Sequence, residues 1–245
     1  MESDYASAYP DLYRRHWWWR VRERILLEKI DALIGTARGK ARLLDVGCGA
    51  GLFFSELERF GYVEGIESDD VAIAQSGAWR NRIVAAQLDA RFTPTEPYDL
   101  VLMLDVIEHV PDHAELLRHV ARVLRPDGRI LITVPAFNAL WTNHDTLNHH
   151  VRRYSARLMR ETLREAGLQT VYLEYFFQSL VLPKLAVRAV EAVMRPPQTV
   201  PRVPTHLLNQ LLKSWFLAEY RTARWLPFGG SLLAVAGRSP STTRR

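Results

Sequence analysis

The sequence of 245 residues predicts an α/β protein in which helices cover both faces of a parallel β-sheet. Between Ala41 and Pro135, short β-branched and aliphatic runs alternate with helical patterns, which is the rhythm of repeated β-α-β units. Two later runs, Tyr98–Val106 and Gly128–Ala136, are almost continuously apolar. Such strands are typical of a sheet that is buried on both faces.

The first predicted strand, ARLLDVG, enters a glycine-rich turn and is followed by the helical pattern LFFSELERF. The strand YVEGIE, the helical pattern VAIAQSG and a third strand that ends at Asp89 come next. After the strand Tyr98–Val106, DHAELLRHVARVL spaces its apolar residues helically. In the turn Arg125–Gly128, proline stops this helix, and we expect Gly128 to adopt an unusual backbone angle.

Beyond the fifth strand, SARLMRETLREAG predicts a helix with Ser155 as its N-cap and Gly167 just past its end. LQTVYLEYFF predicts a sixth strand. Two helices, roughly Gln178–Met194 and His206–Trp225, precede the last strand, Ser231–Arg238. The predicted parts are an N-terminal helical lid (1–40), a core (41–177 and 231–238), a helical insertion (178–230) and a disordered tail (239–245).

Charge is divided unequally along the chain. Residues 1–150 hold 17 basic and 22 acidic side chains, and the remainder holds 15 and 5, so a net charge of +5 conceals −5 and +10. The basic half favours an anionic partner, such as a phosphate, a nucleic acid or a membrane surface, or else reflects solvated helix faces. Cys48 is the single cysteine and cannot form an internal disulfide, which favours a cytoplasmic setting. We expect no secretory signal and no membrane-spanning helix.

The glycine-rich turn carries the first chemical signal. Gly47, Gly49 and Gly51 let the backbone turn sharply and let a ligand approach closely. Their spacing is G-x-G-x-G rather than the G-x-G-x-x-G of dinucleotide sites, and Asp45 would repel a diphosphate. A cofactor with a positive ammonium group suits Asp45 better than NAD, although a tight turn without any ligand is an alternative.

Acidic residues end the following strands. Glu67 stands twenty residues after Gly47 and can accept hydrogen bonds from both hydroxyls of a ribose. Asp89 can accept a hydrogen bond from the exocyclic amine of adenine, or it is simply a helix N-cap. The next strand delivers Asp105, Glu108 and His109 to the same rim, where open α/β sheets bind ligands.

These motifs together resemble the class I S-adenosylmethionine-dependent methyltransferases. LLDVGCGAG, Glu67, Asp89, LDVIEHV and LRPDGRILITVP match that family's signatures in order and spacing. The resemblance implies a seven-stranded Rossmann-like sheet in the order 3-2-1-4-5-7-6 with its last strand antiparallel, and S-adenosylmethionine as cofactor, with S-adenosylhomocysteine as product. The cofactor-binding residues that we expect are Asp45, Gly47, Cys48, Gly49, Glu67, Ser68, Asp89, Ala90, Leu104 and Asp105.

Methyl transfer to a hydroxyl group requires a base. The candidates are His109 and a histidine group formed by His144, His149 and His150, with Asp145 available to orient an imidazole. We favour His149 or His144 as the base. Each of these histidines is alternatively a structural hydrogen-bonding residue. The spacing D-x-x-E-H from Asp105 is similar to the E-x-x-E-H of ubiquinone-type and small-RNA-type O-methyltransferases, in which a magnesium ion is bound. A divalent metal is the less favoured interpretation, because D-V-x-E-H is widespread in methyltransferases without a metal.

The acceptor is expected between the N-terminal helix and the insertion, with Tyr13, Trp17, Asp145, Arg153 and Tyr154 as substrate-facing residues. The insertion combines apolar faces with arginines and lysines, which resembles interfacial amphipathic helices and favours a small or lipid-like acceptor with peripheral membrane contact. Packing of both helices on the core or on a second subunit is the alternative, and no feature indicates an oligomeric state. A nucleic-acid acceptor is disfavoured, because no Asn/Asp-Pro-Pro-Tyr type sequence or RNA-binding motif is present. We therefore expect O-methylation, with N- or C-methylation and a catalytically silent cofactor-binding subunit as alternatives.

Overall fold

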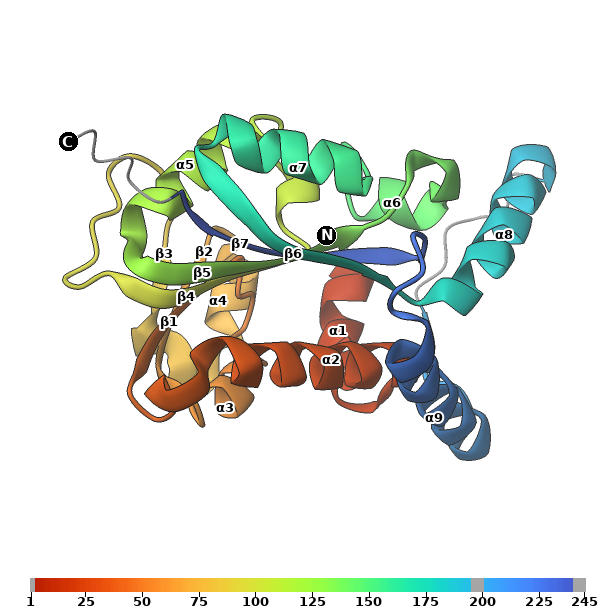
Figure 1. Cartoon of the computed structure of the whole chain (residues 1–245). Coiled ribbons are helices and arrows are strands. Elements are labelled where there is room, and N and C mark those ends of the chain that lie inside the picture. The colour runs from red at the N-terminus through yellow and green to blue at the C-terminus, as the bar shows by residue number, and fades with distance from the viewer. Residues whose placement is uncertain (1–2, 195–200, 240–245) are drawn as a thin grey trace.

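The structure, a computed structural model, describes residues 3–194 and 201–239. The strands form one seven-stranded sheet in the order β3-β2-β1-β4-β5-β7-β6, and β7 is antiparallel to both of its neighbours, which confirms the predicted order and direction (Figure 1). The predicted disordered tail falls outside the described residues except for Ser239. The strands are β1 (Ala41–Val46), β2 (Gly61–Glu67), β3 (Ile83–Ala85), β4 (Tyr98–Leu104), β5 (Leu124–Pro135), β6 (Leu168–Phe176) and β7 (Ser231–Arg238).

Helices cover both faces of this sheet, as Figure 1 shows. Neighbouring residues of a strand point to opposite faces, so Leu44 packs with α5 and α7 in one buried cluster, and Leu43 packs with α2 and α9 in the other. The helices are α1 (Ser3–Arg15), α2 (Trp17–Ile34), α3 (Phe54–Leu57), α4 (Asp70–Ala74), α5 (His113–Val123), α6 (Asn143–Leu147), α7 (Ala156–Glu165), α8 (Val181–Met194) and α9 (His206–Ala223).

Helix α2 packs on the sheet as part of the buried core. Its buried residues include Val21, Ile25 and Ile30, which pack on the sheet. The helix begins after His16, whose ring accepts a hydrogen bond from the Trp18 amide at 3.1 Å. Residues in the α1–α2 region therefore reach the cavity described below from a fixed support.

Two local predictions are wrong. Gly128 does not adopt a left-handed angle, because strand β5 already begins at Leu124 and runs through the expected turn. Glycine is needed there for space, since a Cβ atom would lie 2.8 Å from the carbonyl oxygen of Tyr98. The third strand ends at Ala85 rather than at Asp89, so Asp89 stands in the loop beyond it.

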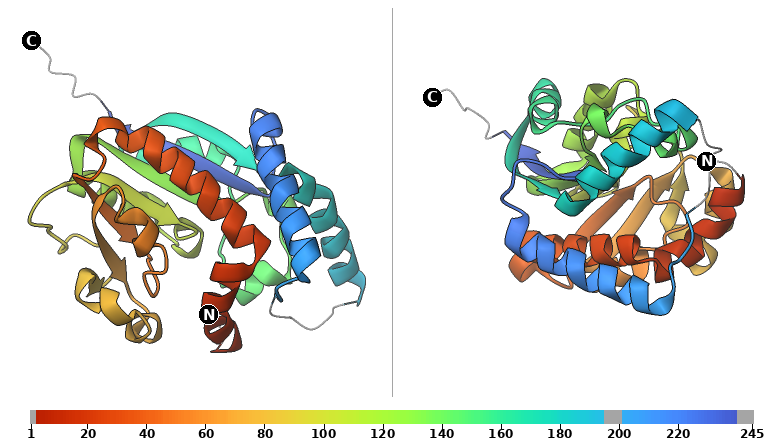
Figure 2. Two further views of the ribbon diagram at one scale, coloured as in Figure 1. Left: turned by 90° about the horizontal axis from the view of Figure 1, so that it is seen from below. Right: turned by 90° about the vertical axis from the view of Figure 1, so that its right-hand side faces the viewer.

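The insertion forms helices α8 and α9, which lie at the same end of the molecule (Figure 2). Helix α8 has no buried residue. In the part of the chain that the structure describes, no helix combines the length and the apolar character that crossing a membrane requires.

Candidate active site

A cavity of about 600 Å³ opens at the carboxyl ends of β1, β2, β4 and β5. Its walls come from the α1–α2 corner, the turn after β1, the segment around α6 and the start of α8. Thirteen of the predicted site residues line it: Tyr13, Trp17, Asp45, Gly47, Cys48, Gly49, Glu67, Leu104, Asp105, His109, His144, His149 and Arg153. Ser68, Asp89, Ala90, Asp145 and Tyr154 are not among its lining residues.

The glycine-rich turn presents open backbone to this cavity. Gly47 and Gly49 have φ values of 70° and 56°, which are strained for residues with a side chain. A Cβ atom on Gly49 would meet nothing within 4 Å, so the space beside it is free for a ligand. The Gly49 amide donates to Oε2 of Glu67 at 2.8 Å, which fixes the Glu67 carboxylate beside the turn.

Asp45 lies beneath the turn and is only 4% exposed. Burial raises the pKa of its carboxyl group to about 7, Arg22 opposes this rise, and Glu67 adds to it. A cationic group in the cavity would favour the ionised carboxylate. The residues at this end thus fit a ligand that brings a positive charge to Asp45 and hydroxyl groups to Glu67.

A buried arginine, Arg22, connects α2 to the carboxyl ends of β4 and β5. Nη2 of Arg22 lies 2.9 Å from Oδ2 of Asp105 and 2.6 Å from Oγ1 of Thr133. Asp105 itself has a φ of 59°, an uncommon angle for a non-glycine residue at the end of β4. Asp105 therefore serves as an anchor for α2, which the sequence analysis did not foresee.

Asp145 orients a histidine, but not either of the two that we favoured. Its Oδ1 lies 2.8 Å from Nδ1 of His150, and both of its oxygens accept hydrogen bonds from Arg153. These partners hold the pKa of the Asp145 carboxyl well below its usual value, although burial opposes them. The carboxylate is therefore charged and fixes the tautomer and the direction of the His150 ring.

The structure changes the ligand set of the less favoured metal interpretation, which was based on the D-x-x-E-H spacing from Asp105. Within the described residues, the group with metal-ligand spacing is Glu108, His109 and His150, whose ligand atoms lie within 4.8 Å of one another. Glu108 is fully buried, and neither of its carboxylate oxygens has a hydrogen-bond partner in the structure. One carboxylate and two imidazoles form a donor set that fits a divalent transition metal better than magnesium.

The charges of this group depend on burial. Burial, with Asp105 adding to it, raises the pKa of Glu108 well above its ordinary value. Burial and the neighbouring His150 lower the pKa of His109. The two rings meet edge to face with their centres 4.8 Å apart. The lowered pKa favours the neutral ring of His109, which is the form in which an imidazole accepts a proton or binds a metal.

Several predicted substrate residues have structural partners instead. Trp17 is 8% exposed and stacks on Phe216 of α9 with ring centres 4.6 Å apart. Tyr154 is fully buried, and its hydroxyl lies 2.6 Å from Nδ1 of His113. The guanidinium of Arg153 is engaged by Asp145 and by a backbone carbonyl, so it has little freedom to bind an acceptor.

The sequence analysis underrated other cavity residues. Trp18, Lys184 and His16 line the cavity, and burial, followed by the effect of Arg153, lowers the pKa of Lys184 to about 8. His150 was considered only as a member of a histidine group. Its adjacency to His149 and its distance of five residues from Asp145 were the available signals, and they did not separate it from its neighbours.

Comparison with known proteins identifies a methyltransferase domain in this chain. The sequence matches the family described as "Methyltransferase domain" over residues 18–173. A protein of Aeromonas salmonicida named "Ubiquinone biosynthesis O-methyltransferase" is 35% identical over 118 residues, which are 44% of this chain and 49% of that protein. A protein of the same name from Bradyrhizobium diazoefficiens is 36% identical over 110 residues, 42% of each chain. The chain thus matches half or less of the length of these relatives.

Solved structures share the fold at low sequence identity. A chain in the complex of the Haloferax volcanii Trm112 methyltransferase activator has a TM-score of 0.58, 18% identity and 97% coverage of both chains. The geranyl diphosphate C-methyltransferase of Streptomyces coelicolor, solved with Mg²⁺, geranyl diphosphate and S-adenosylhomocysteine, has a TM-score of 0.57, 16% identity and coverage of 89% of this chain and 79% of that one. Because the domain match spans most of the chain and the sheet has the expected order, this chain belongs to the class I S-adenosylmethionine-dependent methyltransferases.

Proposed function

We propose that the protein transfers the methyl group of S-adenosylmethionine to an oxygen atom of a small or lipid-like acceptor. The observation that carries the proposal is that one cavity joins the glycine-rich turn to an imidazole directed by a buried carboxylate. The name of the Aeromonas and Bradyrhizobium relatives supports oxygen as the methylated atom. The bound cofactor supplies an electrophilic methyl group on a positively charged sulfur.

In this proposal the two ends of the cavity have separate tasks. Asp45 pairs with the cofactor's ammonium group, Glu67 accepts hydrogen bonds from the ribose, and Gly49 leaves room for both. Alignment of the methyl group with the acceptor oxygen then provides most of the rate, because a fixed approach removes the entropy cost of an encounter.

We assign the role of general base to His150. A hydroxyl acceptor must lose its proton, and the negative charge of Asp145 stabilises the imidazolium that forms when His150 takes that proton. His109, 4.8 Å away between ring centres, is a second acceptor for the proton. His149 and His144 line the same cavity and remain candidates.

A metal-assisted version of the same reaction is favoured by the unpartnered oxygens of Glu108. Glu108, His109 and His150 would hold the ion. A divalent ion at that position would lower the pKa of the acceptor hydroxyl. Titration of the protein with Mn²⁺, Zn²⁺ and Mg²⁺ in a calorimeter tests this version, because Glu108→Gln should abolish the binding heat of the preferred ion.

The main test combines binding and turnover. Calorimetry should show that S-adenosylhomocysteine binds and NAD does not. Methyl-labelled cofactor should then transfer label to catechol-type acceptors with polyprenyl tails. We expect His150→Ala to lower turnover about 100-fold or more while affinity for S-adenosylhomocysteine is retained, and His119→Ala, on α5 outside the cavity, to change neither.

Three outcomes distinguish the alternatives. Label on nitrogen or carbon of the product would replace O-methylation with N- or C-methylation. Cofactor binding without turnover of any acceptor would favour a silent subunit that needs a partner. If His150→Ala has a normal turnover rate and His149→Ala loses turnover, the general base is His149.

A further inference from the structure

Helix α8 turns its charged side chains toward the protein and its apolar side chains outward, which is the opposite of an ordinary surface helix. Its charged residues turn toward the protein: Lys184 lines the cavity, Arg188 Nη1 donates to the Asn138 carbonyl at 2.7 Å, and Glu191 Oε2 accepts from the Asn143 amide at 2.8 Å. The outward side carries only apolar residues, and the exposed fractions of Leu182 and Val193 are 75% and 83%. A helix normally buries its apolar side, so this arrangement favours an apolar partner outside the chain.

Helix α9 and the segment after it continue the same kind of surface. Leu207, Leu211 and Trp215 recur at a spacing of four residues and are 71%, 59% and 61% exposed. Figure 2 shows that α8 and α9 lie at one end of the molecule. We define the α8–α9 apolar face as the exposed residues Leu182, Leu185, Val187, Val190, Val193, Met194, Leu207, Leu208, Leu211, Trp215, Trp225 and Phe228.

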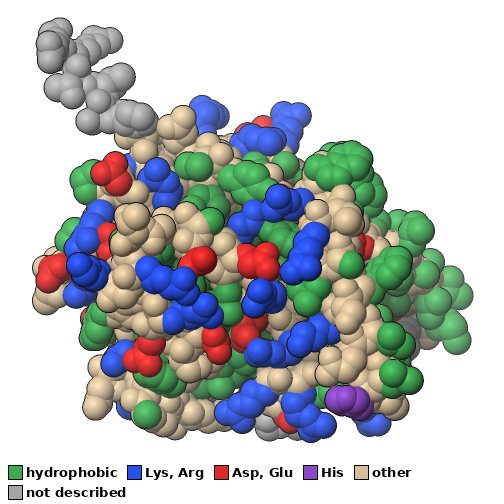
Figure 3. All heavy atoms as spheres, turned by 60° about the horizontal axis from the view of Figure 1, so that its bottom comes forward, with side chains coloured by type: hydrophobic (Ala, Val, Ile, Leu, Met, Phe, Trp, Pro, Cys, Tyr) green, Lys and Arg blue, Asp and Glu red, His purple; other side chains and the backbone are tan. Residues whose placement is uncertain are grey.

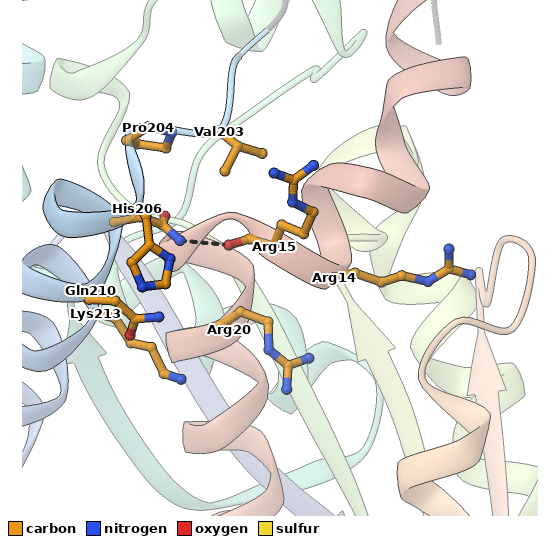
Figure 4. Close-up of a pocket in the computed structure, with 9 residues that line it drawn as sticks. Arg14, Arg15, Arg20, Val203, Pro204, His206, Gln210 and Lys213 are labelled. Carbon is orange, nitrogen blue, oxygen red and sulfur yellow. Dashed lines mark hydrogen bonds between the residues drawn. The ribbon is translucent and has the colours of Figure 1, made fainter.

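A basic pocket of about 290 Å³ adjoins this face (Figure 4). His206, Gln210 and Lys213 of α9 form one side, and Arg14, Arg15 and Arg20 of the α1–α2 corner form the other. Among the described residues, no carboxylate lies within ion-pair distance of Lys213, and the pair between Arg15 and Asp11 is exposed and therefore weak. Arg20, in contrast, is paired with the buried carboxylate of Glu23 at 2.7 Å, so Arg14, Arg15 and Lys213 are the cations available to an anionic ligand. Figure 3 shows many Lys and Arg side chains on this side of the molecule, with some Asp and Glu side chains among them and hydrophobic side chains at the adjoining end.

We propose that the α8–α9 apolar face and the basic pocket together bind the surface of an anionic phospholipid bilayer, with the pocket holding a lipid phosphate. Apolar side chains enter the outer acyl region, and the cations of the pocket meet the headgroups, as in interfacial helices. The charge decides between occupants of this face. A second copy of the chain would bring the same cations to the contact and repel, whereas an anionic membrane is complementary.

Docking in this way would also bring the main cavity close to a lipid-like acceptor in the bilayer. Leu180, Lys184 and Pro201, at the beginning of α8 and at the end of the α8–α9 linker, are walls of the main cavity. A lipid-like acceptor could pass from the bilayer along α8 into that cavity; this step, unlike the docking itself, rests on the proposed function.

Flotation of the full chain with phosphatidylcholine vesicles, with and without phosphatidylglycerol, tests the proposal. We expect binding that requires phosphatidylglycerol, that weakens as salt is raised, and that shifts tryptophan emission to the blue as Trp215 and Trp225 leave water. Arg15→Ala/Lys213→Ala should weaken binding about 30-fold, since each cation near an anionic surface contributes roughly fivefold. Leu182→Ser/Val193→Ser should weaken it more than tenfold.

Matched controls are available on the opposite parts of the surface. Arg160→Ala/Arg164→Ala on α7 removes two exposed cations, and Val84→Ser/Val171→Ser removes two exposed apolar side chains. Both double variants should bind vesicles like the wild type. All variants should keep the wild-type melting temperature and affinity for S-adenosylhomocysteine, because the altered side chains are exposed or lie outside the main cavity.

Four results would overturn the inference in whole or in part. The first is equal vesicle binding by the wild type, by Arg15→Ala/Lys213→Ala and by Leu182→Ser/Val193→Ser. The second is that light scattering shows a dimer for the wild type and a monomer for Leu182→Ser/Val193→Ser, and that the wild type does not bind vesicles. The face would then be an interface between two copies of the chain. Free inorganic phosphate that competes with vesicles at low concentration would move the pocket's ligand from lipid to solute. If the wild type methylates a water-soluble acceptor normally but does not bind vesicles, the docking proposal is refuted and the proposed function is not.

Discussion

Asp45 should make cofactor binding depend on pH. Burial holds the pKa of its carboxyl group at about 7 in the free protein. The cofactor's ammonium group pairs with the ionised form, so below this pKa binding must first release a proton. The ionised fraction falls from about ten in eleven near pH 8 to about one in eleven near pH 6, so affinity for S-adenosylhomocysteine should fall about tenfold, or ~1.4 kcal/mol.

Calorimetry in two buffers of different ionisation enthalpy measures the released protons directly. Nearly one proton should leave per cofactor bound near pH 6 and almost none near pH 8. Asp45→Asn should bind more weakly at high pH and lose this pH dependence, while Asp70→Asn, an exposed residue of α4, should behave as the wild type. The same pH dependence in Asp45→Asn would refute the reasoning and assign the proton to another group.

The raised pKa of Asp45 also affects folding. The folded protein holds this proton more tightly than the unfolded chain does, so the contribution of Asp45 to stability is complete at low pH and is lost as the pH rises from about 4 to about 7. Urea unfolding across this range without cofactor should show that Asp45→Asn removes part of the decline.

Three further predictions concern single side chains. Arg22→Ala should lower the free energy of unfolding by about 2 kcal/mol in urea titrations, because it removes the hydrogen-bonded ion pair with the partly exposed Asp105 and the hydrogen bond to Thr133, whereas Arg24→Ala, exposed on the same helix, should cost less than about 0.5 kcal/mol. Gly49→Ala and Gly39→Ala should each destabilise by about 1 kcal/mol, since both glycines have positive φ, but only the first should weaken S-adenosylhomocysteine binding; equal affinities would contradict a cofactor at the turn. The pH–rate profile of His150→Ala should differ from that of the wild type, and an unchanged profile would exclude His150 as the base.

Much of the fold was predictable because its signals are local. Alternation of apolar runs and helical patterns placed the strands, and Ser155 and Gly167 bounded α7 correctly. The strand order came from the family resemblance rather than from the pattern. The error at Gly128 arose because a glycine required for close packing against Tyr98 looks, in the sequence, like a glycine required for a turn.

The cofactor end of the cavity was also easier to predict than the acceptor end. Asp45, Gly47 and Glu67 stand at fixed positions at the ends of adjacent strands. His150 approaches Asp145 only because α6 stops at Leu147 and His149 adopts a φ of 56°, which turns the chain back. A reversal of this kind has no clear sequence signal, and neither has the contact between Arg22 and Asp105, which are far apart in the chain.

The position of β7 has a consequence for synthesis on the ribosome. This strand lies between β5 and β6, and every hydrogen bond that joins β6 to the sheet passes through it. Strand β6 therefore has no strand to pair with until Ser231–Arg238 has left the exit tunnel. The sheet can begin to assemble around β1 and β4 during translation. Its β6 edge stays unpaired and exposed until β7 is available, which makes this edge the part most in need of chaperone protection.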